Sequence, residues 1–368
     1  MSTGFFWDER CFWHSGGNYA FLAPVGGLVQ PLAAGGLPES PETKRRLKAL
    51  MDVTGLSRAL ACQGAAPASW AELARVHPED FLRKFKALSD EGGGELGLRT
   101  PFGKGGFETA ALSAGLATGA LRAVLRGELD NAYALSRPPG HHCLPDWPNG
   151  FCLLNNIAIA VEAVLAEGLA RRVAVIDWDV HHGNGTEAIF YDRADVLTVS
   201  LHQDRNYPLD TGGVADRGRG DGLGVNVNVP LPPGTGEVGY LSAWDRIVEP
   251  VVDAFSPDVI VVACGFDASG VDPLSRMLLS AQSFAKLTDR AMALAARHCG
   301  GRLVLVHEGG YSELHVPFCG HAAIATLARS GIAADDPLGP RIAGQQPGAA
   351  FDRFVEAWID DLVVALEI

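Results

Sequence analysis

Residues 173–186 read Val-Ala-Val-Ile-Asp-Trp-Asp-Val-His-His-Gly-Asn-Gly-Thr, and this stretch decides the fold that we expect. Its first four residues, Val173 to Ile176, are apolar and mostly β-branched, which is typical of a strand buried on both faces of a parallel sheet. Gly183 and Gly185 indicate a loop soon afterwards. The acids and histidines in between would therefore lie at the carboxyl end of a strand, where open α/β sheets bind their ligands.

Side-chain alternation separates the polar residues of this stretch into two groups. If the extended conformation continues beyond the strand, Asp177, Asp179 and His181 lie on one side, and Trp178 and His182 lie on the other. One side then carries two carboxylates and an imidazole. The alternative is a polar strand end that simply faces water, but neutral residues would do this without crowding two acids beside a histidine pair.

Other apolar runs alternate along the chain with helical patterns, which predicts an α/β fold: a mostly parallel sheet with helices on both faces. The expected strands are residues 131–135, 173–176, 196–201, 225–229, 259–264 and 302–306, and the expected helices begin near residues 41, 78, 108, 155, 237 and 282. Residues 4–36 are aromatic and rich in glycine, and we expect them to lie over the body as a terminal segment. Since no linker or repeat divides the chain, we expect a single domain over residues 1–368.

The composition argues against several classes of protein. Hydrophobic residues make up 47% and charged residues 20%, which is typical of a globular protein with a large core. The net charge of -13 disfavours direct nucleic-acid binding and favours the approach of cationic substrates. Seven cysteines without a Cys-x-x-Cys pair indicate a reducing environment. Because the sequence has no signal-like or bilayer-spanning run, we expect a cytoplasmic protein without membrane contact. The sequence leaves open whether the protein forms a homo-oligomer.

Polar side chains follow four of the expected strands, and a parallel sheet would bring them to one edge. They are His141 and His142, the acids and histidines of residues 177–182, Asp267, and Tyr311. Two aspartates and one histidine from this set would form a three-ligand metal site with a position left open, as in catalytic zinc sites. The same ligands suit manganese or ferrous iron by type, so the pattern predicts a metal without fixing its identity.

Five motifs together resemble those of the zinc-dependent histone deacetylase family. They are Arg137-Pro138-Pro139-Gly140-His141-His142, Gly150-Phe151-Cys152 with Asn155-Asn156, Asp177 to Thr186, Gly265-Phe266-Asp267, and Glu308-Gly309-Gly310-Tyr311. The sequence is most similar to the bacterial histone deacetylase-like amidohydrolases, which resemble the class II deacetylases. The resemblance extends from about Pro41 to Leu327. It implies the arginase-like three-layer fold, with a central parallel sheet of about eight strands between helices.

The resemblance implies that Asp179, His181 and Asp267 bind one catalytic zinc ion. It also implies that His142 is the general base, which takes a proton from metal-activated water and then protonates the leaving amine.

The resemblance gives three further residues supporting roles in this reaction. His141, hydrogen-bonded to Asp177, would orient the base and stabilise the charge that develops. Tyr311 would polarise the acyl carbonyl and stabilise the oxyanion, with the preceding glycines as a hinge.

The resemblance further implies a narrow tunnel for the acylated side chain, with Gly150 and Phe151 in its wall. Tyr207 stands where most relatives have a second phenylalanine, and its hydroxyl would narrow or polarise the tunnel, which leaves the acyl-chain preference open. Leu274 stands where relatives specialised for acetylated polyamines have a glutamate. Asn184 stands where class I enzymes have an aspartate beside the second histidine, and a neutral partner suits a base that rests unprotonated.

Family members also bind potassium, largely through backbone carbonyls. The resemblance implies a first potassium site at the carbonyls of Asp177, Asp179, His181 and Leu201 with the Ser200 hydroxyl. It implies a second site near Phe190, Arg193 and Val196.

The expected function is therefore removal of acetyl or other short acyl groups from acyl-lysine or similar acylated amines by a zinc-dependent amidohydrolase. An acetylpolyamine amidohydrolase of the same family is the alternative. A manganese ureohydrolase shares the fold, but the adjacent His141 and His142 with Tyr311 argue against it. A non-catalytic acyl-lysine binder would be expected to lack a metal ligand or Tyr311, and both are present.

Overall fold

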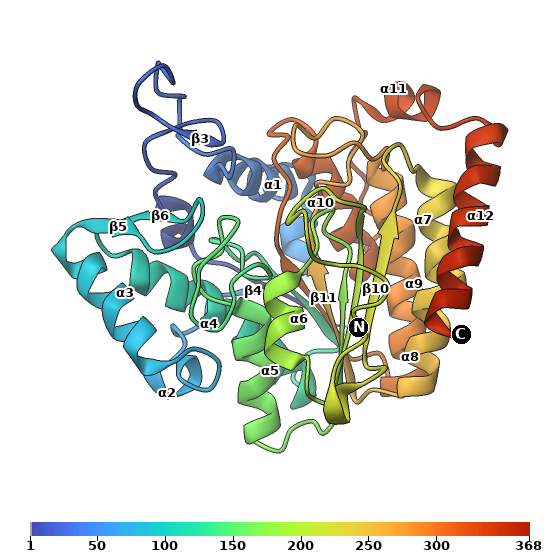
Figure 1. The fold of residues 1–368 in the computed structure, drawn as a ribbon, viewed down its shortest axis with the longest axis horizontal. Coiled ribbons are helices and arrows are strands. Elements are labelled where there is room, and N and C mark those ends of the chain that lie inside the picture. The colour runs from blue at the N-terminus through green and yellow to red at the C-terminus, as the bar shows by residue number, and fades with distance from the viewer. Residues whose placement is uncertain (1) are drawn as a thin grey trace.

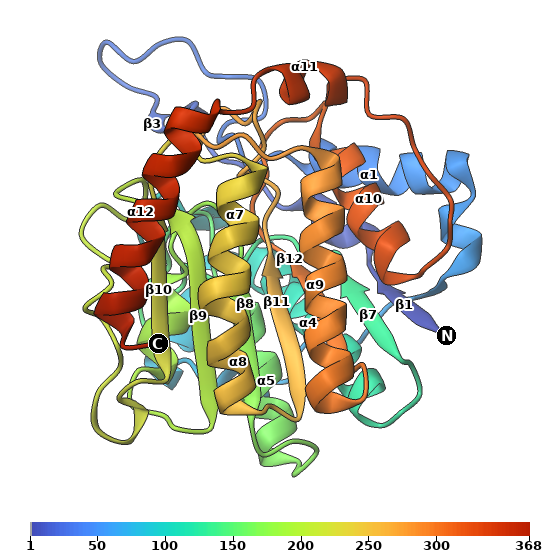
Figure 2. The ribbon, with the colours of Figure 1, turned by 90° about the vertical axis from the view of Figure 1, so that its right-hand side faces the viewer.

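The structure, a computed structural model, describes residues 2–368 and contains a central sheet of eight strands (Figure 1). From one edge to the other the strands are β10 (Asn226–Leu231), β9 (Val196–Gln203), β8 (Val173–Asp177), β11 (Val259–Cys264), β12 (Leu303–His307), β7 (Asn131–Ala134), β1 (Thr3–Phe6) and β4 (Ala61–Gln63). Every neighbouring pair is parallel. The carboxyl ends therefore all point to one edge of the sheet, which is at the top in Figure 2.

Helices cover both faces of this sheet, as the alternating sequence pattern predicts (Figures 1 and 2). One face carries α4 (Gly106–Leu125), α5 (Asn156–Ala166) and α6 (Asn184–Phe190). The other face carries α7 (Glu237–Ala243), α8 (Glu249–Phe255), α9 (Ala281–Cys299), α10 (Val316–Leu327) and α12 (Ala349–Leu366), and α1 (Pro41–Thr54) packs on α10. Three shorter or peripheral helices are α2 (Trp70–Leu73), α3 (Glu79–Glu91) and α11 (Gly339–Gly344).

The strands at the centre of the sheet are buried on both faces, which explains their uninterrupted apolar sequences. Every residue of β8 and β11 is buried. In the ladder, Asp177 at the end of β8 lies opposite Ala263 of β11 and Ser200 of β9. The polar residues that follow β8 therefore begin between the two neighbouring strands, β11 and β9.

The helix α1 begins as its sequence predicts. The Ser40 side chain accepts a hydrogen bond from the backbone N–H of Glu42, Pro41 occupies the first turn, and Gly55 ends the helix with a φ of 85°. These are the usual start and stop signals of a helix, so they made this element predictable.

The first strand contradicts one expectation. Residues 4–6 do not lie over the body, because they belong to β1, which inserts between β7 and β4. Phe5 is fully buried and stacks on Tyr133 with a distance of 5.9 Å between ring centroids. A strand of four residues buried on both faces has no alternating pattern, so periodicity could not reveal it.

The later part of the N-terminal segment does lie over the body (Figure 1). It contains the hairpin β2 (Tyr19–Ala20) and β3 (Ala23–Pro24). This hairpin contacts a second one, β5 (Gly93–Glu95) and β6 (Pro101–Gly103), through a hydrogen bond from the Tyr19 hydroxyl to Glu95. Tyr19 and Leu37 pack in a small apolar cluster with Phe151 and Tyr311. The segment therefore forms part of the surroundings of the candidate site.

The structure agrees with two features of the composition. All seven cysteines are free, and six of them are buried. Among residues 2–368, no helix combines the length and the apolar character needed to cross a bilayer.

Candidate active site

Two carboxylates and one imidazole meet at the carboxyl edge of the sheet. Asp179 and His181 follow β8, and Asp267 follows the neighbouring strand β11. The potential ligand atoms of the three residues all lie within 4.8 Å of one another. Nδ1 of His181 is 3.1 Å from Oδ1 of Asp179 and 3.0 Å from Oδ2 of Asp267. The sequence-predicted ligand set is therefore assembled in space.

The two groups of side chains that alternation predicts are separated in the structure, although β8 itself ends at Asp177. Trp178 is fully buried and packs on Trp244, with ring centroids 6.3 Å apart. The ring of His182 points away from the three-residue cluster, and its Nδ1 lies 2.8 Å from the Thr211 hydroxyl. The side chains thus continue to alternate through the polar residues, although the chain bends at residues 179–181.

The cluster fits a divalent cation. Asp179 and Asp267 are fully buried, and in the described chain no lysine or arginine nitrogen lies within 4.0 Å of either carboxylate. Backbone N–H groups of Gly309 and Val180 donate to them at 2.8 Å, but these do not cancel two buried charges. Carboxylate oxygens and an imidazole nitrogen are ligands that zinc, manganese and ferrous iron accept.

A second group of potential ligands, His141, Cys152 and Glu308, fits a metal less well. One oxygen of Glu308 already accepts two backbone hydrogen bonds, and Nδ1 of His141 donates to Asp177. Sγ of Cys152 already accepts from the N–H of His142 and donates to the Gly150 carbonyl, both at 3.4 Å, and burial raises the pKa of its thiol well above the usual value. The first group is therefore the better candidate for a metal site.

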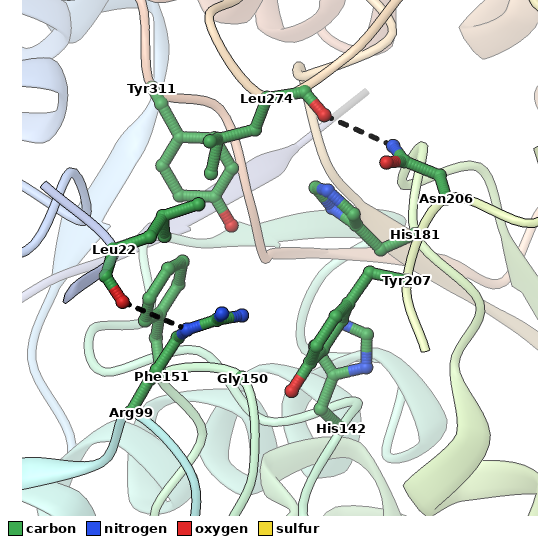
Figure 3. A pocket seen from close by; sticks show the side chains of 10 residues that line it. All are labelled: Leu22, Arg99, His142, Gly150, Phe151, His181, Asn206, Tyr207, Leu274 and Tyr311. Atoms are coloured by element: carbon green, nitrogen blue, oxygen red, sulfur yellow. Dashed lines mark hydrogen bonds between the residues drawn. The ribbon is translucent and has the colours of Figure 1, made fainter. Parts of the chain in front are cut away.

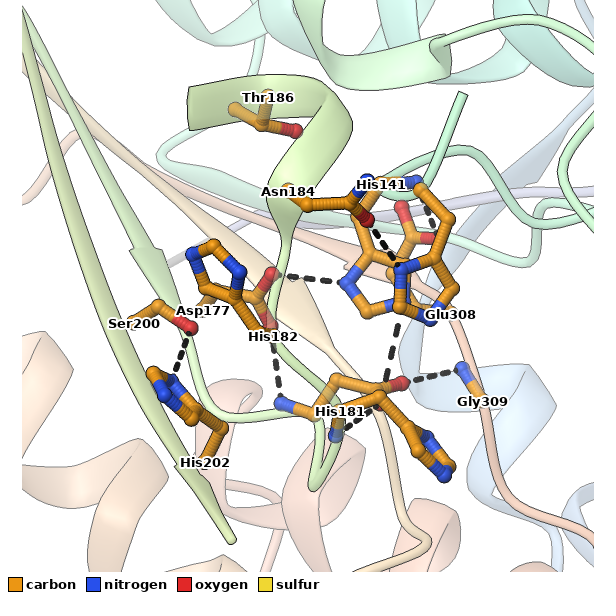
Figure 4. A network of polar contacts seen from close by, with 12 residues as sticks. His141, Asp177, His181, His182, Asn184, Thr186, Ser200, His202, Glu308 and Gly309 are labelled. Carbon is orange, nitrogen blue, oxygen red and sulfur yellow. Dashed lines mark hydrogen bonds and ion pairs between the residues drawn. The ribbon is translucent and has the colours of Figure 1, made fainter. Parts of the chain in front are cut away.

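The adjacent histidines make different hydrogen bonds. Nδ1 of His141 donates to Oδ2 of Asp177 at 2.8 Å (Figure 4). Nδ1 of His142 donates to Oδ1 of Asn184 at 2.8 Å. Burial opposes protonation of His141, but the carboxylates of Asp179 and Asp177 outweigh it and raise its pKa. Burial lowers the pKa of His142 well below its usual value, and the nearby His141 lowers it further. His141 therefore favours the protonated, positively charged form, and His142 favours the neutral form that can act as a base.

Two buried acids that sequence reasoning left without a role hold this edge of the site together. Oε2 of Glu308 accepts hydrogen bonds from the backbone N–H groups of Gly140 at 2.6 Å and His141 at 3.1 Å. The carboxylate of Asp272 accepts from the N–H groups of Tyr311 at 2.8 Å and Leu274 at 2.9 Å. Glu308 stands in one of the quoted motifs and Asp272 in none, and both acids bond to backbone groups, which no sequence pattern identifies.

A cavity of about 140 Å³ opens above the metal ligands (Figure 3). Its lining includes the predicted wall residues Gly150, Phe151, Tyr207 and Leu274, together with His142, His181 and Tyr311. Leu22, Arg99 and Asn206 also line it. These three were not predicted, because they lie on irregular loops whose position depends on the folded body.

The tyrosine at position 207 presents its ring to the cavity and not its hydroxyl. The hydroxyl donates a hydrogen bond to Oδ1 of Asn149. The ring meets His142 edge-on, with centroids 5.0 Å apart. In this arrangement Tyr207 resembles a phenylalanine on its cavity side.

The ring of Tyr311 lies beside Phe151 and His181, with centroid distances of 5.6 and 6.1 Å. Burial raises the pKa of its hydroxyl well above the usual value, so the group stays protonated and can donate a hydrogen bond. The glycine at 309 is required by close approach, because a Cβ there would lie 2.2 Å from Oδ2 of Asp267. The proposed hinge motion of Tyr311 stays a prediction.

Gly150 has a φ of 50°, and a Cβ there would lie 2.5 Å from Cδ2 of His142 and 2.9 Å from the Tyr207 ring. We expect Gly150→Ala to lower the free energy of unfolding for two reasons. An alanine in the left-handed backbone conformation is less stable than a glycine, and the close contacts of its Cβ add about 1–3 kcal/mol for overpacking. Gly127, with a φ of 72° and nothing near its missing Cβ, is the matched control. Gly127→Ala should cost only about 1 kcal/mol in denaturant unfolding. Equal losses in the two variants would contradict the close contact.

The residues of the two predicted potassium sites are separated along the sheet, because Ser200 pairs with the last residue of β8 and Val196 pairs with the first. Asp177 and Ser200 are opposite each other in the ladder, and the Ser200 hydroxyl lies 2.9 Å from Nδ1 of His202. At the second position, the Phe190 carbonyl accepts a hydrogen bond from the N–H of Arg193 at 2.9 Å, and β9 begins at Val196. Potassium binding at both positions stays a prediction.

Comparisons with known proteins agree with this arrangement. Residues 37–327 match the model of the histone deacetylase domain. The chain is 57% identical over 360 residues to a histone deacetylase-like amidohydrolase of Pseudomonas aeruginosa, covering 98% of this chain and 95% of that protein. It is 42% identical to a probable deacetylase of Archaeoglobus fulgidus over 297 residues, covering 79% of this chain and 82% of the relative. The crystal structure of the HDA15 HD domain matches all of this chain and 97% of that chain, with a TM-score of 0.81 and 29% identity, which confirms the expected arginase/deacetylase-like fold.

Proposed function

The chain belongs to the histone deacetylase family, and from this premise we propose that it is a zinc-dependent amidohydrolase that removes acetyl or other short acyl groups from acyl-lysine or similar acylated amines. The observation that carries the proposal is the buried cluster of Asp179, His181 and Asp267 beneath a narrow cavity that also exposes His142 and Tyr311. We also propose that the chain forms a single catalytic domain.

Asp179, His181 and Asp267 would hold the zinc ion through two carboxylates and Nδ1 of the imidazole. When bound, zinc supplies a Lewis acid for the acyl carbonyl and a lowered pKa for the attacking water. The proposed potassium ions, at the carbonyls near Asp177 and Ser200 and near Phe190, would act through their charge and by holding the chain in place.

The two histidines would have different roles: His142 would transfer protons, and His141 would stabilise charge. Because Nδ1 of His142 donates to Asn184, Nε2 keeps its lone pair and can take a proton from the attacking water. The same nitrogen would then pass the proton to the leaving amine. His141, whose Nδ1 donates to Asp177, would remain positively charged and stabilise the negative charge that develops on the reacting carbonyl.

Tyr311 would donate its hydroxyl proton in a hydrogen bond to the acyl oxygen as that oxygen becomes an oxyanion. Its backbone N–H is fixed by Asp272 and its ring by Phe151, so the donor is already placed before the substrate arrives. The apolar faces of Phe151, Tyr207 and Leu274 would pack on the methylenes of an acylated side chain.

The purified protein can test this function directly. We expect about one zinc ion per chain by elemental analysis, and hydrolysis of acetyl-lysine peptides that stops on chelation and returns with zinc. Release of urea from guanidino substrates would indicate a ureohydrolase instead. Binding of acyl-lysine peptides without turnover by the metal-loaded protein would indicate a non-catalytic binder.

The rim residue Leu274 gives a second prediction, which concerns polyamines. An apolar side chain offers no charge partner to the inner amine of an acetylated polyamine, whereas a carboxylate in a partly desolvated site contributes roughly 1–3 kcal/mol of discrimination. We therefore expect the protein to prefer acetyl-lysine peptide over acetylspermidine and acetylputrescine. Leu274→Glu should shift the ratio of kcat/KM toward the polyamines by roughly tenfold or more.

The control for this shift is Leu209→Glu, which adds the same charge at an exposed position that does not line the cavity. It should leave the substrate ratio unchanged. If the unmodified protein already prefers the polyamines, the acetylpolyamine alternative is correct. If Leu274→Glu leaves the ratio where it was, the rim position does not select between substrates.

A further inference from the structure

We propose that Arg99 recognises a carboxylate on the substrate at the mouth of the cavity, so that the favoured substrates are acyl-lysines whose own α-carboxylate is free. This inference rests on the proposed function and names the substrate class more closely. It comes from a cation that lines the cavity beside the candidate catalytic groups and that no sequence motif had identified.

The side chain of Arg99 is held in place at this mouth. Its backbone has a φ of 57°, and its carbonyl accepts a hydrogen bond from the N–H of Phe151 at 3.1 Å. Its Nε donates to the Leu22 carbonyl at 3.2 Å, and its guanidinium carbon lies 5.8 Å from the centroid of the Tyr207 ring. A strained backbone that is fixed by its neighbours is a feature that structures use at binding sites.

The two terminal nitrogens of Arg99 have no protein partner in the part of the chain that the structure describes. No carboxylate lies within 4.0 Å of them, and only Nε is engaged in a hydrogen bond. The nearby acid Glu95 forms no ion pair with Arg99, and its Oε1 accepts from the Tyr19 hydroxyl at 2.6 Å and the Thr100 N–H at 2.9 Å. The planar pair of N–H groups is therefore available, and a carboxylate is the group that it binds in a bidentate manner.

The rest of the mouth offers no competing charge. None of the residues that line the cavity is acidic, although the chain as a whole carries a net charge of -13. On the wall across from Arg99, Asn206 donates to the Leu274 carbonyl at 3.0 Å, which fixes that wall as a neutral surface. In Figure 3 the guanidinium lies between Phe151 and Tyr207 and points into the cavity.

The position of Arg99 determines which part of a substrate it would meet. An acyl-lysine with its amide near His142 and Tyr311 extends four methylenes toward the mouth, so its α-carbon and the groups attached to it emerge beside Arg99. A free α-carboxylate there pairs with the guanidinium, while the cationic inner amine of a polyamine is repelled. An acidic residue next to the acyl-lysine of a peptide would supply the same chemistry from a different source.

Three substrates separate these cases: Nα,Nε-diacetyl-lysine, its neutral α-carboxamide, and a dipeptide amide in which glutamate follows the acyl-lysine. For the metal-loaded protein we expect kcat/KM for the free carboxylate to exceed that for the carboxamide by about tenfold, the factor given by roughly 1.4 kcal/mol. Arg99→Gln should bring this ratio close to one, and Arg99→Lys should restore part of the preference. Arg205→Gln removes a positive charge from an exposed position that does not line the cavity and should keep the full ratio.

The remaining outcomes are also decisive. A wild-type ratio near one, or a ratio that Arg99→Gln leaves unchanged, overturns the inference. A preference for the glutamate peptide over the free carboxylate would show that Arg99 reads a neighbouring residue and would overturn the assignment to the α-carboxylate. If none of the substrates is hydrolysed, the proposed function fails, and calorimetric binding of the same three compounds to wild type and Arg99→Gln still tests Arg99.

Discussion

Asp267→Ala is expected to abolish hydrolysis of acyl-lysine substrates and to remove the metal from the purified protein. Only Asp179 and His181 would remain as ligands, and catalytic zinc sites usually use three protein ligands. The variant should therefore show turnover at the background level and well below one metal ion per chain by elemental analysis. Wild-type activity in a variant shown to be free of metal would contradict the proposed mechanism.

Stability provides an independent test of the same site, because the sign of the effect depends on the metal. Without metal, Asp179 and Asp267 are two buried carboxylates close together, so Asp267→Asn should raise the melting temperature of the metal-free protein. With metal present, the variant loses a ligand and should melt below the wild type. A melting temperature that changes in the same direction in both states would indicate that Asp267 does not hold a metal.

A control is available at the other end of the same strand. Asp258 precedes β11, and its Oδ2 accepts hydrogen bonds from the backbone N–H groups of Arg171 at 2.8 Å and Arg172 at 3.0 Å. Asp258→Ala should lower stability by about 1–3 kcal/mol through these lost bonds. It should leave the metal content and turnover of the remaining folded protein unchanged, because it lies at the opposite edge of the sheet from the candidate site.

The central part of the fold was predictable because its strands carry a strong local signal. The apolar runs in β8 and β11 are each followed by acids, directly by Asp177 in β8 and by Asp267 three residues after the end of β11, and parallel strands bring such ends to one edge. This reasoning also placed Asp179, His181 and Asp267 near one another. The same reasoning brought the histidine pair and Tyr311 to this edge, and the motif resemblance added the roles that we expect for them.

The parts that the sequence did not reveal depend on tertiary structure. Residues 4–6 become a strand of the large sheet, next to its edge strand β4, only because β7 and β4 leave a place between them. The hydroxyl of Tyr207 turns toward Asn149, and this choice is set by a loop that lies 58 residues away in the chain. Arg99 and Leu22 reach the cavity from irregular segments, whose sequences have no periodic pattern of apolar and polar residues from which their position could be predicted.

Tyr311→Phe is expected to leave the fold and the metal in place while lowering kcat by about 10² or more, which is the usual effect of losing one oxyanion donor. The phenyl ring can keep the contacts with Phe151 and His181, and the backbone N–H can keep its bond to Asp272. The loss should therefore appear in kcat and in kcat/KM to a similar degree, because the hydroxyl would act mainly on the transition state. Metal content and melting temperature should remain close to those of the wild type.

Tyr19→Phe is the matched control for this loss. Tyr19 belongs to the same apolar cluster as Tyr311, but its hydroxyl donates to Glu95 and the residue does not line the cavity. Removing that hydroxyl should cost at most about 1–2 kcal/mol of stability and should change kcat little. If the two variants lose activity equally, the cluster supports the site only by packing. If Tyr311→Phe keeps wild-type turnover on an acetyl-lysine peptide, its hydroxyl does not stabilise the oxyanion, and the electrostatic part of catalysis must come from His141 and the metal alone.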